Sequence, residues 1–548
     1  MRKHALFLFL SISFCCIGFL VGFTLKDSFS SSGSNLSRYA SSVAKFEEVL
    51  RYLQANYFEP LEPDKLVEDA IKGMLQKLDP HTFYIPSSEL KEINEQMEGS
   101  FEGIGIEFNI IEDTLYVVSP IAGGPSERAG IQAGDRIIKV DNENIAGVGI
   151  TNNDVIKRLR GKKGTQVKLE VRRKGIKKNL EFTITRDKIP IYSVDNSTMV
   201  DKETGYIRII RFASTTFREF SDHVARLKEQ GMKNLILDLR NNPGGYLDQA
   251  FYVCDMFLEE GKMIVSTKGR IPSSNKEYRA TSEISDLEKG GVIVLINDGS
   301  ASASEIVAGA IQDWDRGLII GTRSFGKGLV QQQHILSDES AIRVVVSRYF
   351  TPKGRCIQKP FSRGDREYNN EILRRYDSGE IFHEELIKLP DSLKYKTHAG
   401  RIVYGGGGIM PDIYLPPDTS GKSNYLNNLF IKNIFNDFAL RYVEKNPRFK
   451  QLYKDGKDFA QRFEFSEPLI QEFIQYATNQ GVEYNAKDFE TSRKIISLRL
   501  KMSLARAAYG EEGFLSVYLQ EDPVLKKAVE LMPASIELAR TGKFAKSK

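Results

Sequence analysis

The sequence predicts a multidomain α/β protein with helical regions at its N- and C-terminal ends. A chain of 548 residues is longer than one hydrophobic core usually fills, so three or four structural units are expected. In its middle, apolar strands alternate with amphipathic helical segments, the pattern of an α/β sheet. Near both ends, apolar residues instead recur at a spacing of three and four, which indicates helices.

Composition excludes several classes of function. The chain is 27% charged with a net charge of +5, and its basic residues are dispersed, so nucleic acid is not an expected partner. Its 6 histidines lie far apart and form no Cys/His cluster. We therefore expect neither a metal site nor a cofactor. Cys254 and Cys356 could pair in an oxidising compartment, but we expect buried free thiols.

Residues 1–25 read as a signal peptide or signal anchor. A basic start precedes the apolar segment Ala5–Leu25, which is long enough to cross a bilayer, for which about 20 residues suffice. No small-residue cleavage site stands out, so an uncleaved anchor is favoured over a cleaved signal. Either way, the rest of the chain is expected to be exported, on the periplasmic or cell-envelope side of the inner membrane.

Residues 26–98 are predicted to form a linker followed by helices. Lys26–Ser42 is rich in Ser and Gly, and the segments FEEVLRYLQANYF and KLVEDAIKGMLQKL then show helical spacing. His81 lies in the turn LDPHTFYIP, and we interpret it as a structural residue.

Residues 99–186 are predicted to form a small domain of short strands and two helices. The runs GIGI and AGIQAGDRIIKVDN resemble a PDZ domain, although another β-rich module could also contain the first run. The resemblance implies that a glycine-containing loop binds a C-terminal carboxylate and that the peptide adds as an extra strand. The substrate-binding residues so implied are Gly103, Ile104, Gly105 and Ile106. Arg160 is a candidate link to the active site, with an ordinary salt bridge as the alternative.

Residues 187–418 carry the predicted α/β core. The strand NLILDLR ends in the turn Asn242–Gly245, and the apolar strand VIVLIND ends in a loop of small residues, NDGSASASE. Two such loops at neighbouring strand ends can form an oxyanion hole between them. The charged stretch 359–398 is interpreted as an insertion or surface loop, and residues 419–548 as helices that pack on the core or mediate self-association.

A serine and a lysine are the candidate catalytic groups. Ser300, Ser302 and Ser304 lie on the small-residue loop, and Lys327 lies between two glycines after an apolar strand. No G-x-S-x-G motif is present, and His334 is interpreted as a packing residue. Burial can lower the pKa of a lysine from about 10.4 towards neutrality, which allows it to act as the base. Spacing alone does not choose among the three serines.

Five runs, in order, resemble the C-terminal processing peptidases, also called tail-specific proteases, a Ser-Lys group within peptidase family S41. They are DLRNNPGG, NDGSASASEIVAGAIQD, GTRSFGKGLVQ, SRYFTPKGRCIQ and GGIMPDI. The resemblance implies a crotonase-like α/β protease core with an inserted PDZ domain. It also implies roles for five residues: Ser302 as nucleophile, Lys327 as base, Gln331 as the group that orients the lysine, and Gly244 and Ala303 as oxyanion donors.

Two alternatives remain. Gly321–Lys327 fits the P-loop pattern G-x-x-x-x-G-K, but Gly328 stands where a P-loop needs Ser or Thr. A PDZ-bearing adaptor with an inactive hydrolase core is the second alternative. The favoured prediction is a serine endopeptidase that cleaves exported proteins recognised by their free C-terminal tails. Its N-terminal segment would contact the membrane, and the chain could form a homo-oligomer.

Overall fold

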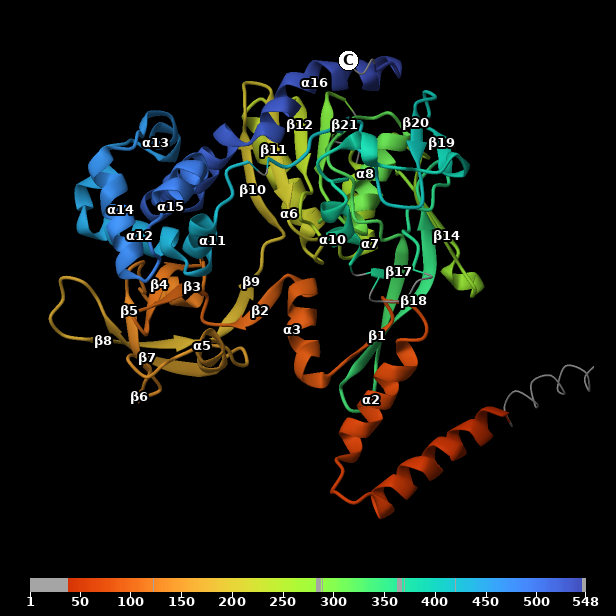
Figure 1. Ribbon diagram of the computed structural model, residues 1–548, viewed down its shortest axis with the longest axis horizontal. Coiled ribbons are helices and arrows are strands. Elements are labelled where there is room, and N and C mark those ends of the chain that lie inside the picture. Colours follow the sequence, from red (N-terminus) through yellow and green to blue (C-terminus); the bar gives the residue numbers. More distant parts are fainter. Residues whose placement is uncertain are drawn as a thin grey trace, which may run out of the picture. The chain divides into compact units, whose positions relative to one another are not determined.

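Figure 1 shows the fold in a computed structural model. The structure describes residues 38–544 except 122, 282–286, 288, 362–366, 369 and 419. By its internal contacts the chain divides into two units, residues 1–78 and 79–548, each of which is described by itself.

The described part of the first unit is helical. Residues 38–56 form one helix, and α2 (Pro63–Leu75) follows it, as the apolar spacing predicts. The predicted linker is shorter than expected, because residues 38–42 are already helical. The predicted signal or anchor segment Ala5–Leu25 lies outside the described residues. Within the described ranges, no helix has both the length and the apolar character needed to cross a membrane.

A six-stranded sheet forms the centre of the second unit. Its order is β10-β11-β12-β15-β16-β21, and all neighbours are parallel except the antiparallel pair β10 and β11. The central strands β12, β15 and β16 are buried along their whole length because both faces of the sheet are covered, and most of their residues are apolar. Their bounds are β10 (Val194–Met199), β11 (Thr204–Ile209), β12 (Asn234–Asp238), β15 (Val292–Ile296), β16 (Leu318–Gly321) and β21 (Ile413–Tyr414).

Helices cover the two faces of this sheet. On one face, α6 (Thr216–Glu229), α7 (Leu247–Asp255) and α8 (Ala303–Asp313) share a core with the strands. On the other face, α16 (Pro523–Thr541) packs against β15 and β16, and Figure 1 shows it lying over the sheet. The parallel pairing of β12 with β15 confirms that the two predicted loops leave neighbouring strand ends.

A second, five-stranded sheet adjoins the first. It contains β1 (Phe83–Ile85), β13 (Met263–Gly269), β14 (Lys276–Arg279), β17 (Leu329–Ile335) and β18 (Ala341–Phe350). β1 pairs with β18, so part of the segment LDPHTFYIP, which was interpreted as a turn from the sequence, forms a strand of this sheet. The short strands β19 (Lys394–Lys396) and β20 (Ile402–Tyr404) form a separate pair.

The inserted domain has the predicted short strands and two helices. β3 lies at one end of its sheet, whose order is β3-β4-β5-β7-β8, with β6 beside β5. The paired strands β2 (Ser100–Gly103) and β9 (Asp187–Pro190) carry the chain into and out of this domain. The helix α3 (Ser87–Glu98) precedes this domain. The remaining elements of the domain are β3 (Ile106–Ile111), β4 (Thr114–Pro120), α4 (Pro125–Arg128), β5 (Arg136–Val140), β6 (Glu143–Asn144), α5 (Asn152–Leu159), β7 (Gln166–Arg172) and β8 (Leu180–Thr185).

Residues beyond Asp418 are helical, as predicted, and enclose an aromatic-rich core of their own. The long helix α15 is kinked at Gly510, where the backbone is not helical. The helices are α11 (Asn424–Ile431), α12 (Ile434–Lys445), α13 (Gly456–Arg462), α14 (Glu467–Asn479) and α15 (Ala486–Glu521), with short 3-10 turns at Pro272–Ser274, Glu384–Leu386, Asp391–Leu393 and Pro447–Gln451.

The interpretation of residues 359–398 as a surface loop is wrong for part of this stretch. Lys359, Tyr368 and Arg375 are buried, the last at the end of α10 (Glu371–Asp377). The positive charges of Lys359 and Arg375 are tolerated in the interior because both side chains form ion pairs with Glu371.

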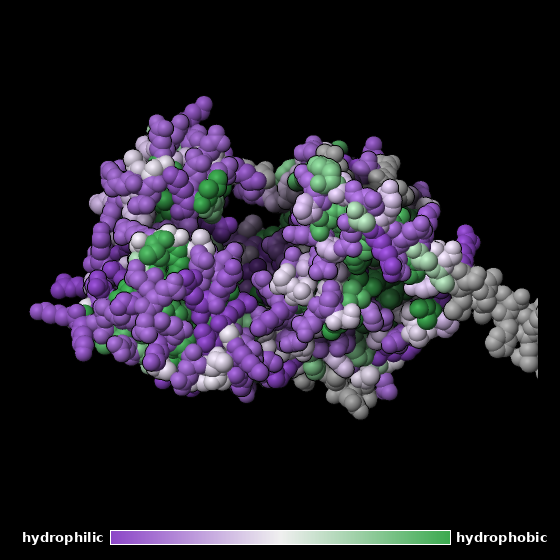
Figure 2. All heavy atoms as spheres, turned by 90° about the horizontal axis from the view of Figure 1, so that it is seen from below, coloured by the Kyte–Doolittle hydropathy of each residue, from purple (hydrophilic) through white to green (hydrophobic). Residues whose placement is uncertain are grey.

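The face of the molecule shown in Figure 2 is mostly hydrophilic. Cys254 and Cys356 are both free thiols; Cys254 is buried, as expected, whereas Cys356 is only partly buried.

Candidate active site

One cavity collects all five catalytic and oxyanion residues named from the sequence. It has a volume of about 400 Å³ and lies where the ends of β12 and β15 meet the second sheet. Its wall includes Gly244, Ser302, Ala303, Lys327 and Gln331. These five residues come from three separate segments of the sequence and lie together at one site.

Ser302 stands at the turn between β15 and α8. Its backbone has φ 54° and ψ −113°, a combination that a residue with a side chain rarely adopts. Ser302 directly precedes the first residue of α8, so the partial positive charge of the helix N-terminus lies beside it. The neighbouring serines have structural contacts: Ser300 Oγ donates to the Leu239 carbonyl and Ser304 Oγ to the Asn242 carbonyl. Both therefore tie the loop to the end of β12.

Gly244 lies directly against Ser302. A Cβ atom built on Gly244 would stand 2.7 Å from Ser302 Cβ, 2.7 Å from the Ala301 carbonyl oxygen and 2.9 Å from Ala303 N. Its φ of +97° is also one that favours glycine. The Gly244 N–H donates to Asn242 Oδ1 at 2.9 Å, so this amide already has an acceptor.

Lys327 enters the cavity from the turn before β17. Burial lowers its pKa to about 8, with a smaller contribution from the positive charge of Arg343. Its Nζ donates to Gln331 Oε1 at 2.7 Å, so Gln331 contacts the lysine as the resemblance implies. A lysine with this pKa is neutral in a substantial fraction of molecules near neutral to mildly alkaline pH.

Glu305 joins the serine loop to the lysine turn. Its buried carboxylate accepts from the backbone amides of Ser302 at 2.8 Å, Gly326 at 2.7 Å and Lys327 at 2.9 Å. Ser324 Oγ donates to it as well, at 2.5 Å. Burial raises the pKa of Glu305 to about 7, although these hydrogen bonds oppose the shift. One carboxylate thus fixes the backbones of Ser302 and Lys327 relative to each other.

Reasoning from the sequence missed three residues of this site: Glu305, Asn242 and Tyr349. The Tyr349 hydroxyl is buried and lies 3.0 Å from the Ser302 carbonyl oxygen and 2.8 Å from that of Lys327. Glu305 and Asn242 stand inside the motifs that were read, so their position was a usable signal. Tyr349 comes from β18 and also stands inside one of the five runs, SRYFTPKGRCIQ, but its place on a strand gave no indication that its side chain reaches the site.

The predicted peptide-binding residues Gly103–Ile106 connect β2 to β3. The carbonyl of Ile104 accepts from Ser126 N and Oγ, and the carbonyl of Gly105 accepts from Ile121 N. These contacts fix the loop in front of β3, which has a free edge within its sheet.

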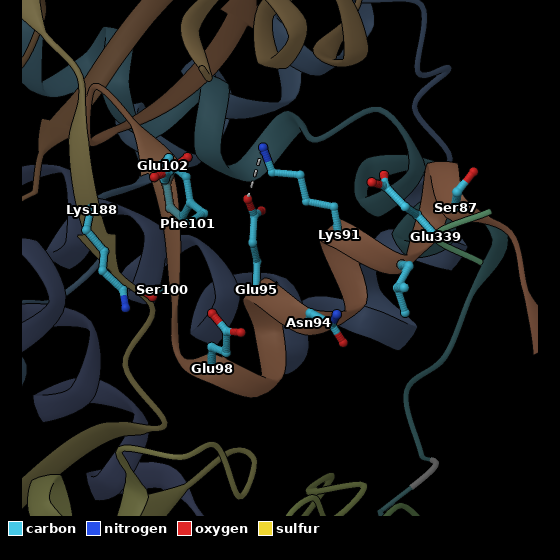
Figure 3. A pocket seen from close by; sticks show the side chains of 11 residues that line it. Ser87, Lys91, Asn94, Glu95, Glu98, Ser100, Phe101, Glu102, Lys188 and Glu339 are labelled. Atoms are coloured by element: carbon cyan, nitrogen blue, oxygen red, sulfur yellow. Dashed lines mark ion pairs between the residues drawn. The ribbon is translucent and has the colours of Figure 1, made fainter. Parts of the chain in front are cut away.

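Arg160 joins the inserted domain to α3. Its guanidinium lies 2.7 Å from Glu95 Oε2 and stacks over the Phe101 ring. Figure 3 shows Glu95 and Phe101 in the wall of a pocket of about 450 Å³, with Lys91 pointing toward Glu95. Asn94 lines both this pocket and the cavity around Ser302.

The P-loop alternative is wrong. A P-loop lysine precedes a helix whose N-terminal amides contact phosphate, whereas Lys327 is followed by the strand β17. The amides of Gly326 and Lys327 also donate to the Glu305 carboxylate, which would repel a phosphate.

Comparison with known proteins identifies four regions of the chain. Residues 203–364 match peptidase family S41, and residues 116–173 match a PDZ domain. Residues 23–88 match the N-terminal domain of the activating protease CtpB, and residues 425–510 match a family of unknown function.

Two curated relatives, each matched over 58% of this chain, are named carboxy-terminal processing proteases. A carboxy-terminal-processing protease of Bartonella bacilliformis is 41% identical over 58% of this chain and 72% of its own length. The carboxy-terminal processing protease CtpA of Bacillus subtilis is 38% identical over 58% of this chain and 66% of its own length. A solved structure, a photosystem II D1 C-terminal processing protease, is 29% identical over 67% of this chain and 86% of its own, with a TM-score of 0.34. The chain belongs to the carboxy-terminal processing proteases of peptidase family S41 and is a serine-type peptidase with a PDZ domain.

Proposed function

We propose that this peptidase uses Ser302 as nucleophile and Lys327 as general base. The observation that carries the proposal is a cavity that holds both residues, with the lysine partly buried and its pKa lowered to about 8. The neutral Lys327 amine takes the proton of Ser302 Oγ, and this oxygen attacks the carbonyl carbon of the scissile peptide bond. The resulting ammonium then protonates the leaving nitrogen as the C–N bond breaks, which leaves an ester on Ser302.

Hydrolysis of the ester repeats the same proton transfers. Lys327 takes a proton from water, whose oxygen attacks the ester carbonyl carbon. The bond to Oγ breaks, Oγ regains the proton from Lys327, and the new C-terminal carboxyl group leaves with the product. Gln331 would hold one N–H of Lys327, so that the lone pair faces Ser302.

Gly244 and Ala303 are the proposed donors to the oxyanion of both steps. The Ala303 N–H is the first amide of α8 and has no acceptor within the helix. The Gly244 N–H would exchange its contact with Asn242 for the oxyanion when substrate binds. Such donors stabilise the negative charge that develops in the transition state.

The PDZ domain is proposed to capture the free C-terminal tail of a substrate at Gly103–Ile106. The free edge of β3 supports this role, because a peptide can add to it as a further strand. The Arg160–Glu95 ion pair would then couple the PDZ domain to α3, which reaches the catalytic cavity through Asn94.

We also propose that the chain is exported and that it divides into five regions. The apolar segment Ala5–Leu25 supports an exported peptidase, anchored to the inner membrane or released from it, that cuts other exported proteins. The proposed boundaries are residues 1–25, 26–98, 99–186, 187–418 and 419–548.

A homo-oligomer is supported by the helix over residues 38–56. Apolar side chains recur along it in alternating steps of four and three residues, the spacing of a coiled-coil seam, and nearly all are exposed. They are Tyr39, Val43, Phe46, Leu50 and Leu53. A second copy of the same helix is the proposed partner, because it presents the same spacing.

Cleavage of an unfolded protein with an apolar tail tests the proposed function. The chain without residues 1–25 is expected to cut the substrate, whereas its Ser302→Ala variant is not, with the cuts mapped by mass spectrometry. The same substrate with an amidated C-terminus should be cut more slowly if the PDZ domain reads the carboxylate. Equal rates for both substrates would refute tail recognition, and cutting by Ser302→Ala would refute the nucleophile.

A further inference from the structure

The amide of Gln331 is held at both ends. Its Oε1 accepts from Lys327 Nζ at 2.7 Å, and its Nε2 donates to the backbone carbonyl of His81 at 2.5 Å. The His81 carbonyl therefore decides which end of the amide faces the lysine. Without it, the amide could rotate and present N–H groups to Lys327, where they would bind the lone pair needed to accept the serine proton.

The turn that carries this carbonyl is fixed by its own side chains. Asp79 Oδ1 accepts from His81 N at 2.8 Å, and Asp79 Oδ2 accepts from Thr82 Oγ1 at 2.7 Å. Thr82 Oγ1 in turn accepts from Val345 N of β18, the strand that pairs with β17. The turn is thus attached to the same sheet that presents Gln331.

The His81 ring supplies a further anchor for the turn. Its Nε2 lies 2.7 Å from the hydroxyl of Tyr368, and the two rings meet edge to face. Tyr368 is 3% exposed and belongs to the stretch between β18 and α10. Lys359 lies over its ring and is itself paired with Glu371. Tyr368 is therefore held by packing and charge from a part of the core remote in sequence from His81.

Charged groups on several elements face the His81 ring. They are Lys327, Asp79 and Lys359, with the phenol of Tyr368 as hydrogen-bond partner. Burial lowers the pKa of His81 to about 4, and the positive charge of Lys327 acts in the same direction. The imidazole ring of His81 is thus uncharged near neutral pH and adds no positive charge beside Lys327.

We propose that His81 and Tyr368 are positioning residues for Lys327: their contact holds the His81 carbonyl in place, and this carbonyl orients Gln331 toward the lysine. The inference rests on the proposed role of Lys327 as base. Neither residue contacts the substrate in this account. Both act through Gln331, so their loss should slow the chemical step rather than weaken substrate binding.

The test is the pH dependence of kcat for a quenched-fluorescence peptide with an apolar free C-terminus. Tyr368→Phe removes only the hydroxyl and keeps the buried ring, so it should fold normally. We expect kcat to fall about 10-fold with KM unchanged. This fall is smaller than the whole contribution of a general base to the rate, because Lys327 itself is still present. The acidic limb of the kcat profile should move to lower pH, because the ammonium form of Lys327 loses a well-placed acceptor.

Three further variants make the result specific. His81→Ala should behave like Tyr368→Phe, whereas His81→Gln, whose amide can still meet the Tyr368 hydroxyl, should retain most of kcat. Tyr376→Phe on α10 is the matched control, since its hydroxyl donates to Asp298 near the surface, and it should leave kcat unchanged. An unchanged kcat profile in Tyr368→Phe, or a limb that moves to higher pH, would overturn the proposal. Full activity of Ser302→Ala would instead refute the nucleophile itself.

Discussion

Lys327, the proposed base, shows how burial can lower the pKa of a side chain that is usually charged. Its partner is an amide oxygen, and among the described residues no carboxylate pairs with it, so the charge of Glu305 offsets the effect of desolvation only in part. Ser302 is held in a strained backbone conformation by its attachments to Glu305 and Tyr349. The functional residues are thus positioned mainly through their backbones.

The pKa of Lys327 predicts the pH dependence of catalysis. If neutral Lys327 is the base, kcat should rise with pH through about 8 and then level off. A rate profile of peptide cleavage checks this directly. A flat profile between about pH 6 and pH 10 would show that no group with this pKa acts as the base.

The same pKa predicts a linked change in stability. The folded pKa of about 8 lies below the usual 10.5, so the unfolded chain binds more protons between these values. The free energy of unfolding should therefore rise as pH increases through that window. The rise should be smaller in Lys327→Met, measured by urea unfolding; identical slopes for both proteins would contradict the burial of a titrating lysine.

At the scale of elements, the site depends on the close approach of the turn after β12, which carries Gly244, to the loop after β15, which carries Ser302. Gly244→Ala places a methyl group 2.7 Å from both Ser302 Cβ and the Ala301 carbonyl, so the loops must separate and cleavage should be lost. Gly261→Ala is the matched control: its φ of +79° is equally unfavourable to alanine, but nothing lies within 4 Å of the added Cβ. Full cleavage by Gly244→Ala would show that this approach is not needed.

The sequence predicts the structure best where an apolar strand leads directly into a turn that carries a candidate functional residue. Strands β11, β12 and β15 follow from their apolar runs, and the placement of Gly244 and Ser302 follows from turns at neighbouring strand ends. The pairing of β1 with β18, and the burial of Tyr368 and Arg375, depend on contacts distant in sequence. Their charged or turn-rich surroundings resemble those of exposed loops, so local pattern gave no signal.

At the scale of the whole molecule, the chain combines a protease core, a PDZ domain and helical regions of different character. α16 completes the protease core by covering the second face of its sheet, with Ser535 Oγ donating to the Val292 carbonyl. The helix over residues 38–56 instead presents apolar side chains to solvent. This difference separates a helix needed for folding of the core from one suited to association.

Self-association through that helix is the prediction at this scale. Phe46→Glu introduces a charge into the apolar seam and should shift the chain toward monomer in sedimentation velocity experiments. Ala55→Glu introduces the same charge on the same helix but outside the seam, and it should leave the distribution unchanged. A monomeric wild-type chain, or equal behaviour of the two variants, would contradict the proposed pairing.

The most direct test of the central claim is the rate of peptide cleavage in Lys327→Ala and Ser302→Ala, each compared with the wild-type chain at pH values on both sides of 8. The Ser-Lys mechanism predicts that each variant loses cleavage by a factor of at least about 100 while remaining folded. Cleavage near the wild-type rate in either variant would contradict it.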